Sequence, residues 1–128
     1  MRTIMLRNEA ERLNVPLDAV KKTLARAISK GEIQGIIDSQ NEELIRYELE
    51  ELDGLSEKLR SKRVRLRDLA EEMNLKVEQS RLIIDKLMEE GRIQGEYASD
   101  GSFVSQTIIK ESIIDDAEKN HIRILLHK

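Results

Sequence analysis

The phrase Gly-x-Ile-Gln-Gly occurs twice in this chain, at residues 31–35 and 91–95, so the two copies lie 60 residues apart. Shifting the chain by 60 places residues 4–39 on residues 64–99 without a gap, and ten positions are identical, where unrelated segments share roughly two. The identical pairs are Leu6/Leu66, Arg7/Arg67, Ala10/Ala70, Glu11/Glu71, Asn14/Asn74, Gly31/Gly91, Ile33/Ile93, Gln34/Gln94, Gly35/Gly95 and Ser39/Ser99. A chemical site needs its motif once, whereas an architectural unit can repeat. The sequence therefore predicts an internal repeat with a period of 60 residues.

Each unit predicts a short strand, then a short helix, then a longer helix. The short helices, "RNEAERLN" and "RDLAEEMN", end at Asn14 and Asn74, and Asn tolerates the left-handed conformation common at helix ends. Their glutamates, Glu9 among them, are expected on the outer face. The longer helices carry apolar residues at i, i+4, i+7 and i+8 and end at Gly31 and Gly91, which we expect to need a positive φ.

The segments after these glycines predict a two-stranded ribbon in each unit. "EIQGIID" and "RIQGEYA", which contain Gly35 and Gly95, read as strands, and Asp100-Gly101 is a strong hairpin signal. The corresponding turn in the first unit is expected at Ser39–Asn41, with Asn41 in the place of Gly101 and "ELIRY" as the returning strand. Helix, turn, helix and a ribbon together follow the winged-helix plan.

The remaining segments extend this plan on both sides of the second unit. Leucines at 49, 52, 55 and 59 predict an amphipathic helix over about residues 48–61. "TIIKESIIDDAEKN" predicts another, and Ile124 and Leu126 stand 60 residues after Val64 and Leu66, which predicts a strand. The expected division is residues 1–47 for a first winged helix lacking its first helix, 48–106 for a second, and 107–128 for a helix and strand that open a third. The expected fold class is α+β, mainly α.

Because the frame starts and stops within a unit, two hypotheses remain open. Either the chain is a piece of a longer tandem array, or copies associate head to tail, with the last helix and strand of one copy completing the first unit of another. An open unit leaves apolar surface that must be covered.

The composition favours a globular protein and points away from several functional classes. Hydrophobic residues make up 39 % and charged residues 37 %, and the formal net charge is −3. Cysteine is absent, which fits an intracellular, cytoplasmic protein, and no apolar run approaches the ~20 residues of a membrane span. We find no nucleophile, metal-ligand or phosphate-loop pattern. The expectation is a protein without enzymatic activity, cofactor, metal or membrane partner.

The repeated unit resembles the winged helix of PCI-type scaffold subunits. The resemblance rests on Leu-Ala-x-x-Met-Asn-Leu at residues 69–75 and on "G-x-I-x-G-x-I-D" at residues 31–38. The tandem arrangement, with one amphipathic helix between units, is most similar to the ligase scaffold family that transfers the ubiquitin-fold modifier. The resemblance implies a protein–protein interaction scaffold, within a modifier-ligase assembly, that contributes no catalytic residue. It covers nearly the whole chain.

The alternative is a DNA- or RNA-binding regulator that uses the basic helix 17–30 and the basic stretch 58–67, because winged helices often place their second helix in the major groove. The helix over residues 17–30 carries four cations against Asp18, a balance of +3; they are Lys21, Lys22, Arg26 and Lys30. The helix over residues 77–90 has two cations against four acids, a balance of −2. An acidic helix is a poor ligand for phosphates, so a tandem DNA reader is disfavoured.

A second basic cluster, "KLRSKRVRLR" at residues 58–67, is predicted to contact protein partners together with the ribbon tip. Cations at a helix end complement the helix dipole, so a solvated surface is the plain interpretation of this cluster. The predicted contact residues are Lys58, Arg60, Lys62, Arg63, Arg65 and Arg67 in the cluster, and Asp100 and Phe103 in the ribbon. We therefore expect other protein subunits as partners.

Overall fold

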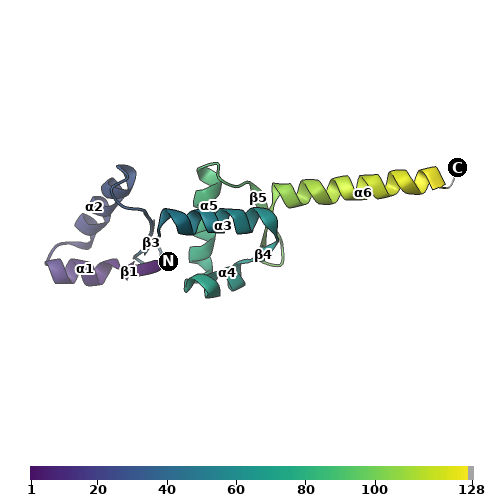
Figure 1. The fold of residues 1–128 in the computed structure, drawn as a ribbon. Helices are drawn as coiled ribbons and strands as arrows, with labels where there is room; N and C mark the ends of the chain where they lie inside the picture. Colours follow the sequence, from purple (N-terminus) through teal and green to yellow (C-terminus); the bar gives the residue numbers. More distant parts are fainter. Residues whose placement is uncertain (127–128) are drawn as a thin grey trace.

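The computed structural model describes the backbone of residues 1–126 and the side chains up to Lys119. Unit one contains β1 (Arg2–Met5), α1 (Leu6–Leu13), α2 (Leu17–Ser29), β2 (Gly35–Asp38) and β3 (Glu43–Arg46). Unit two contains α3 (Leu49–Ser61), β4 (Val64–Arg65), α4 (Leu66–Met73), α5 (Val77–Glu89), β5 (Gly95–Tyr97) and β6 (Ser102–Ser105), and α6 (Gln106–Leu126) follows (Figure 1). Helices with two small antiparallel sheets confirm the predicted α+β, mainly α class.

The two units have the same connectivity. Their sheets have the orders β1-β3-β2 and β4-β6-β5. In each sheet the two ribbon strands pair with each other, and the strand before the short helix, β1 or β4, pairs with the second ribbon strand, β3 or β6. Helices α1 and α4 begin 60 residues apart, as do α2 and α5. In both units the amide that opens the short helix donates to the ribbon turn: Leu6 N to Glu42 O and Leu66 N to Gly101 O, each at 3.0 Å. Each unit therefore has the winged-helix arrangement.

The helix ends show why the shared asparagines and glycines stand where they do. Asn14 and Asn74 follow the short helices with φ of 55° and 56°. Gly31 and Gly91 have φ of 75° and 74° and come directly after the C-cap residues Lys30 and Glu90, two residues beyond the ends of α2 and α5. A left-handed residue there lets the chain turn back while its amide caps the free carbonyls of the last turn.

The first ribbon turn differs from the sequence prediction in one residue. Glu42, and not Asn41, adopts the positive φ, at 53°, and therefore corresponds to Gly101 at 81°. Asn41 instead forms a hydrogen bond within the ribbon turn: its side-chain Nδ2 donates to Asp38 Oδ2 at 2.7 Å. The strands are also shorter than expected: they begin at Gly35 and Gly95, so the first glycine of each phrase lies in the preceding turn.

Two apolar clusters form the core. The larger lies in unit two, where α3 contributes Leu52, Leu55 and Leu59 to a core built from α4, α5, β4 and β6. Ile45 and Tyr47 at the end of the first sheet join this larger core. The smaller cluster, in unit one, has only four buried residues: Leu6, Ala10, Val20 and Leu44. The sheet of unit one therefore separates the two cores, with its outer face against unit two.

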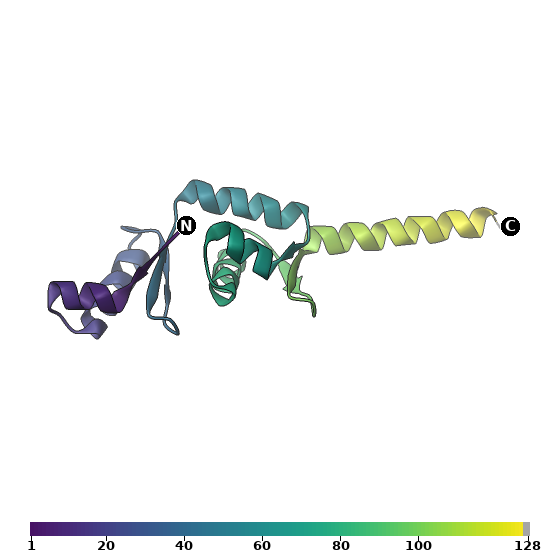
Figure 2. The same cartoon turned by 90° about the horizontal axis from the view of Figure 1, so that it is seen from below.

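Helix α3 runs from the sheet of unit one along unit two to the base of α6 (Figures 1 and 2). Its start is capped by a reciprocal pair of hydrogen bonds between Glu48 and Glu51. The side chains that it buries lie at i, i+3, i+4 and i+7, which is the spacing of one helix face.

The predicted strand at the end of the chain is wrong. The backbone of α6 remains helical through Leu126, and the helix projects away from the body (Figure 1). A strand needs a neighbouring strand to pair its amides and carbonyls, and both described sheets already have their three strands. A helix satisfies those groups within itself, so it is the structure available to an isolated segment. Among the described residues, no helix is long and apolar enough to cross a membrane.

Candidate functional site

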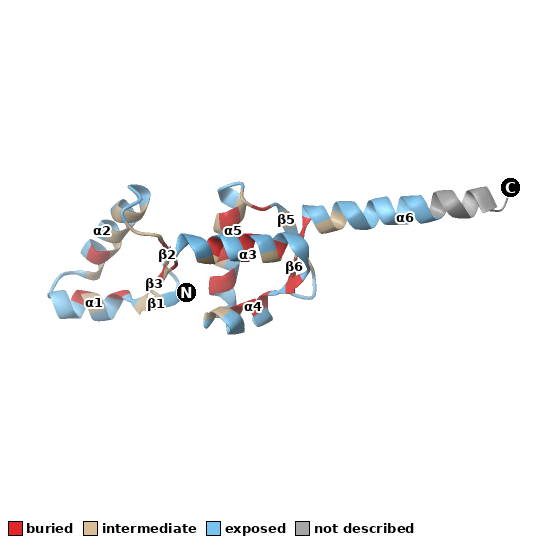
Figure 3. Ribbon diagram, viewed as in Figure 1, coloured by how far each residue is buried: buried red, intermediate tan, exposed pale blue. Residues whose placement is uncertain are grey.

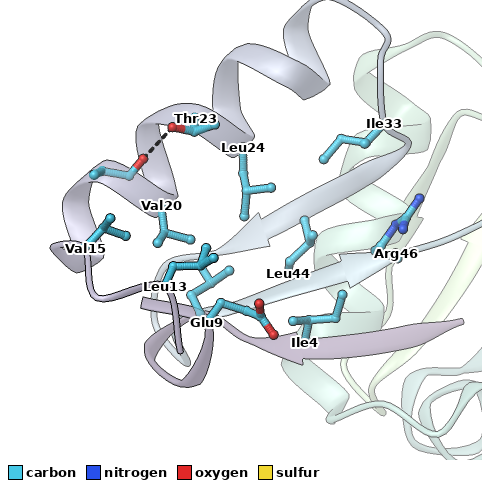
Figure 4. Close-up of a pocket in the computed structure, with 12 residues that line it drawn as sticks. Ile4, Glu9, Leu13, Val15, Val20, Thr23, Leu24, Ile33, Leu44 and Arg46 are labelled. Atoms are coloured by element: carbon cyan, nitrogen blue, oxygen red, sulfur yellow. Dashed lines mark hydrogen bonds between the residues drawn. The ribbon is translucent and has the colours of Figure 1, made fainter. Parts of the chain in front are cut away.

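The most prominent surface feature is an open apolar groove on unit one, between α1, α2 and the sheet. It has a volume of about 510 Å³. Figure 4 shows aliphatic side chains from both helices and from the strands converging on it. We call it the unit-one groove; it is lined by Ile4, Leu6, Glu9, Leu13, Val15, Ala19, Val20, Thr23, Leu24, Ile33, Leu44 and Arg46.

Large apolar side chains are left in solvent at this groove. Leu13 is 53 % exposed and Val15 41 % exposed, although both stand at the mouth of the smaller core. Exposed apolar groups that gather in one hollow mark a contact surface more often than scattered ones do.

Polar groups at the groove are few. Glu9 lines the groove instead of lying on the outer face, and its carboxylate accepts hydrogen bonds from Arg12 Nε at 3.1 Å and Arg12 Nη2 at 2.7 Å. The Thr23 hydroxyl donates to the carbonyl of Ala19 at 2.7 Å, within its own helix (Figure 4). Glu9 and Thr23 are thus satisfied locally, and Arg46 is the one other polar residue in the lining. A groove with few polar groups that need a hydrogen-bond partner suits an apolar ligand surface and not a charged small molecule.

The same surface exists in unit two, where it is buried under α3. Leu13 and Val15 correspond to Met73 and Leu75, which pack against the larger core. Two other positions are larger and more apolar in unit two, where Leu69 corresponds to Glu9 and Ile83 to Thr23, and Ile84 corresponds to Leu24. These three residues of unit two are at most 1 % exposed. The unit-one groove is therefore the counterpart of a surface that an amphipathic helix covers elsewhere in this molecule.

A second notable cluster is polar and joins the two units. Gln79 Nε2 donates to Asp38 Oδ2 and to Glu43 Oε1, both at 3.0 Å, and Lys76 Nζ lies 2.5 Å from Glu43 Oε1. Asp38, Glu43 and Gln79 are all buried. Burial by itself raises the pKa of Asp38, but hydrogen bonds from Asn41, Gln79 and the backbone of residues 40 and 41 outweigh it and hold that pKa below its usual range. Hydrogen bonding to Glu43 raises the pKa of Lys76.

This cluster fixes how α5 lies on unit one. Helix α5 contacts β2, and Leu82 and Lys86 of α5 line the same cleft as Ile36 and Ile37 of β2. This face of α5 is the one that a winged helix offers to the major groove of DNA. In unit two, unit one occupies that face.

The equivalent face of α2 is uncovered and basic. Lys22, Arg26 and Lys30 stand four residues apart on one exposed stripe of α2, with Lys21 half-buried beside it. None of the ion pairs found in the described part of the chain involves these four residues. The structure therefore leaves three of the four predicted nucleic-acid residues, Lys22, Arg26 and Lys30, exposed to solvent, and Lys21 partly exposed.

The predicted contact residues of the basic cluster are partly engaged inside the molecule. Lys58 pairs with Glu72, the Arg63 guanidinium lies 3.0 Å from Asp100 Oδ2, and Arg60 Nη1 donates to the carbonyl of Arg92 at 2.9 Å. Lys62, Arg65 and Arg67 are exposed. Whether these cations contact a partner stays a prediction.

Phe103 was wrongly predicted as a partner contact. Its side chain has no exposed surface, because β6 turns it into the core of unit two, where it packs edge to face on Tyr97 with ring centroids 5.7 Å apart. The ring also lies close to Gly95, where an added Cβ would come within 2.5 Å of Phe103 Cζ.

Sequence reasoning missed the groove itself. The predicted sites were charged clusters, whereas the groove is made of ordinary core-type residues. The signal was present in the comparison of the two units, since Glu9 and Thr23 stand where unit two has buried aliphatic residues. Within the described residues, no three His, Asp or Glu side chains gather in a group that could hold a metal ion.

Comparison with known families gives one match. A family model described as the PCI domain matches residues 1–48, which span β1 to the start of α3. This part of the chain is therefore PCI-like, in agreement with its winged-helix arrangement, and PCI domains typically assemble in multi-subunit complexes. No curated protein matches the chain.

Proposed function

We propose that this protein is a non-catalytic protein–protein interaction scaffold built from tandem copies of one winged-helix unit, and that the unit-one groove is its main binding surface. The observation that carries the proposal is the contrast between the two units. The groove is open in unit one, and the corresponding surface of unit two is covered by α3. The natural ligand of the groove is therefore an amphipathic helix, which is a common mode of recognition.

The PCI match supports the scaffold proposal from a second direction, because it falls on the unit that carries the groove. As a finer proposal, the chain acts in a cytoplasmic assembly that transfers a ubiquitin-fold modifier, where it positions other subunits. Its support is the tandem order of units with one amphipathic helix between them, as α3 lies here.

The scaffold proposal is tested by affinity capture from lysate of the source cells with matched variants. Val15→Glu places a charge in the groove at a residue that is 41 % exposed, so the fold should survive. Val77→Glu makes the same change at a residue that is 44 % exposed and lies on α5, away from the groove. We expect the wild type and Val77→Glu to recover a stoichiometric protein, and Val15→Glu to lose it. Equal recovery by all three chains would contradict the proposal.

Nucleic-acid binding is kept as a second candidate because the stripe on α2 is exposed and unpaired among the described residues. Fluorescence anisotropy with generic duplex DNA and structured RNA at low salt is the test. If this function exists, binding is micromolar or tighter, weakens steeply with salt, and is lost in a Lys21→Glu, Lys22→Glu, Arg26→Glu variant. Under the scaffold proposal binding stays weak, since the helix over residues 77–90 carries a net charge of −2 and only α2 is basic.

A further inference from the structure

We propose that the groove of unit one takes helix α6 of a second copy of this chain, so that copies associate head to tail. This inference rests on the proposed function, since it names the occupant of the same groove. The junction between units one and two supplies the pattern, and three observations support it.

The first observation is that α6 follows unit two as α3 follows unit one. Directly after the ribbon, Tyr47 N donates to Gln34 O, and in unit two Gln106 N donates to Gln94 O at 2.8 Å. After each of these hydrogen bonds the chain continues into a helix, α3 or α6, that extends away from the preceding ribbon. Helix α3 goes on to cover unit two, whereas α6 is exposed on every described side chain from Lys110 to Lys119 (Figure 3).

The second observation is that four of the seven exposed large apolar residues in the described part of the chain lie at opposite ends of the molecule. Ile113 and Ile114 on α6 are 63 % and 45 % exposed, and they face solvent as Leu13 and Val15 do at the groove. Because α6 projects away from unit one, it does not reach its own groove (Figure 1). A second copy brings the two apolar surfaces together.

The third observation is a match of charge on the neighbouring surface. Within the chain, Ile36 on the outer face of the first sheet lies in one cleft with Leu82 of α5. Counting by 60, Glu96 on β5 takes the place of Ile36, and Lys22 on α2 takes the place of Leu82. Both are exposed. If one copy sits on the next as unit one sits on unit two, Glu96 of the first meets Lys22 of the second, with Arg26 one turn away.

The junction between copies is weaker than the junction within the chain. By strand pairing, Ala98 and Ser102 take the places of Asp38 and Glu43 in the second ribbon, which is one residue shorter than the first. Pro16 and Ala19 take the places of their partners Lys76 and Gln79, so the buried hydrogen bonds are lost. Helix α6 also begins directly at Gln106, without the two-residue link that precedes α3. Association is therefore reversible. A heterologous contact of this kind leaves one groove and one helix free at the ends, so it is open-ended.

The test is analytical ultracentrifugation of full-length chains from about 10 μM to 1 mM. Wild type is expected to grow in mass with concentration and to pass beyond a dimer, and Val77→Glu should behave the same. Val15→Glu, with a blocked groove, and Ile113→Glu, with a blocked helix, should each be monomeric. Mixing these two variants should give a one-to-one dimer that grows no further, because one intact groove then meets one intact helix.

A charge swap tests the geometry independently. Lys22→Glu should raise the dissociation constant ~3- to 10-fold, and adding Glu96→Lys to the same chain should restore it. A monomeric wild type at every concentration, association that Val15→Glu leaves intact, a monomeric mixture, or a swap without rescue would each overturn the proposal. If wild type is monomeric but Val15→Glu still abolishes capture of another protein, only the self-association fails. If neither association nor groove-dependent capture occurs, the scaffold function fails with it.

Discussion

At the scale of single residues, Gly35 and Gly95 have a different duty from Gly31 and Gly91. The latter supply a positive φ at the end of a helix, with open space around the Cα. Gly35 and Gly95 sit where two strands approach closely, and a Cβ at Gly35 would lie 2.8 Å from the carbonyl oxygen of Ile45. The repeated Gly-x-Ile-Gln-Gly motif thus contains two glycines with separate backbone roles: the first ends a helix, and the second allows two strands to approach closely. Neither involves chemistry.

We predict that Gly95→Ala destabilises the protein by about 2–4 kcal/mol, because overpacking against a fixed core is not relieved by rotation. The added Cβ would meet both Phe103 Cζ and Val104 O at 2.5 Å. Gly54→Ala is the control. Gly54 lies within α3 with nothing within 4 Å, so the change should stabilise by ~0.5–1 kcal/mol. Urea unfolding measures both, and similar effects of the two changes would contradict the strand-contact account.

A pH dependence follows from Asp38. Its pKa in the folded state lies below the value of 3.8 for a free side chain, so the ionised form is favoured by folding. The resulting stabilisation is complete above the unfolded pKa and is lost as the pH falls through the folded pKa. We predict that Asp38→Asn costs about 1–3 kcal/mol at neutral pH, from the loss of charge-assisted hydrogen bonds.

The difference in the free energy of unfolding between wild type and Asp38→Asn should become smaller from neutral pH to about pH 2.5, because the Asp38 carboxyl of the wild type becomes protonated. Urea unfolding at the two pH values measures this free-energy difference at each pH. Asp115→Asn, on the exposed part of α6, should show no such change. A constant difference at both pH values would mean that the charge of Asp38 plays no part.

At the scale of elements, the sequence was sufficient to predict a helix or a helix end wherever the signal lies within the element itself. The α3 helix and the helix ends at Asn14 and Asn74 are examples, since their signals are local. The prediction failed where pairing with a distant segment decides. The end of α6 has the alternation of a strand but no strand beside it. The error in the first ribbon turn is local: Glu42 adopts the positive φ, while Asn41 donates to Asp38, three residues before it.

The role of α3 as the cover of unit two is testable by truncating its side chains. Leu59 has no exposed surface, so Leu59→Ala should cost about 2–5 kcal/mol through lost contacts and the cavity that remains. Leu49 on the same helix is 47 % exposed, and Leu49→Ala should cost less than about 1 kcal/mol. Thermal unfolding compares the two. A small effect of Leu59→Ala would show that α3 does not stabilise the core.

At the scale of the whole molecule, the two units are alike in plan and unlike in completeness. Unit two has its cover helix and a large core; the core within unit one is a cluster of four buried apolar residues beside an open groove. The fold class could be predicted because the period of the sequence repeats the order of elements. The groove was missed because its lining consists mostly of ordinary core-type residues, whose exposure depends on which neighbour is present; the only local signal was Glu9 and Thr23 at positions where unit two has buried aliphatic residues.

The central claim is that the unit-one groove binds a helix of a protein partner, and methyl NMR on the isotope-labelled full chain tests it most directly. On addition of the captured partner protein, or on self-association at high concentration, the methyl signals of Leu13, Val15 and Leu24 should shift or broaden, while those of Leu52 and Leu59 on the buried face of α3 stay in place. If those three signals are unchanged while the backbone of α2 around Lys22 responds to duplex DNA, the scaffold account is contradicted.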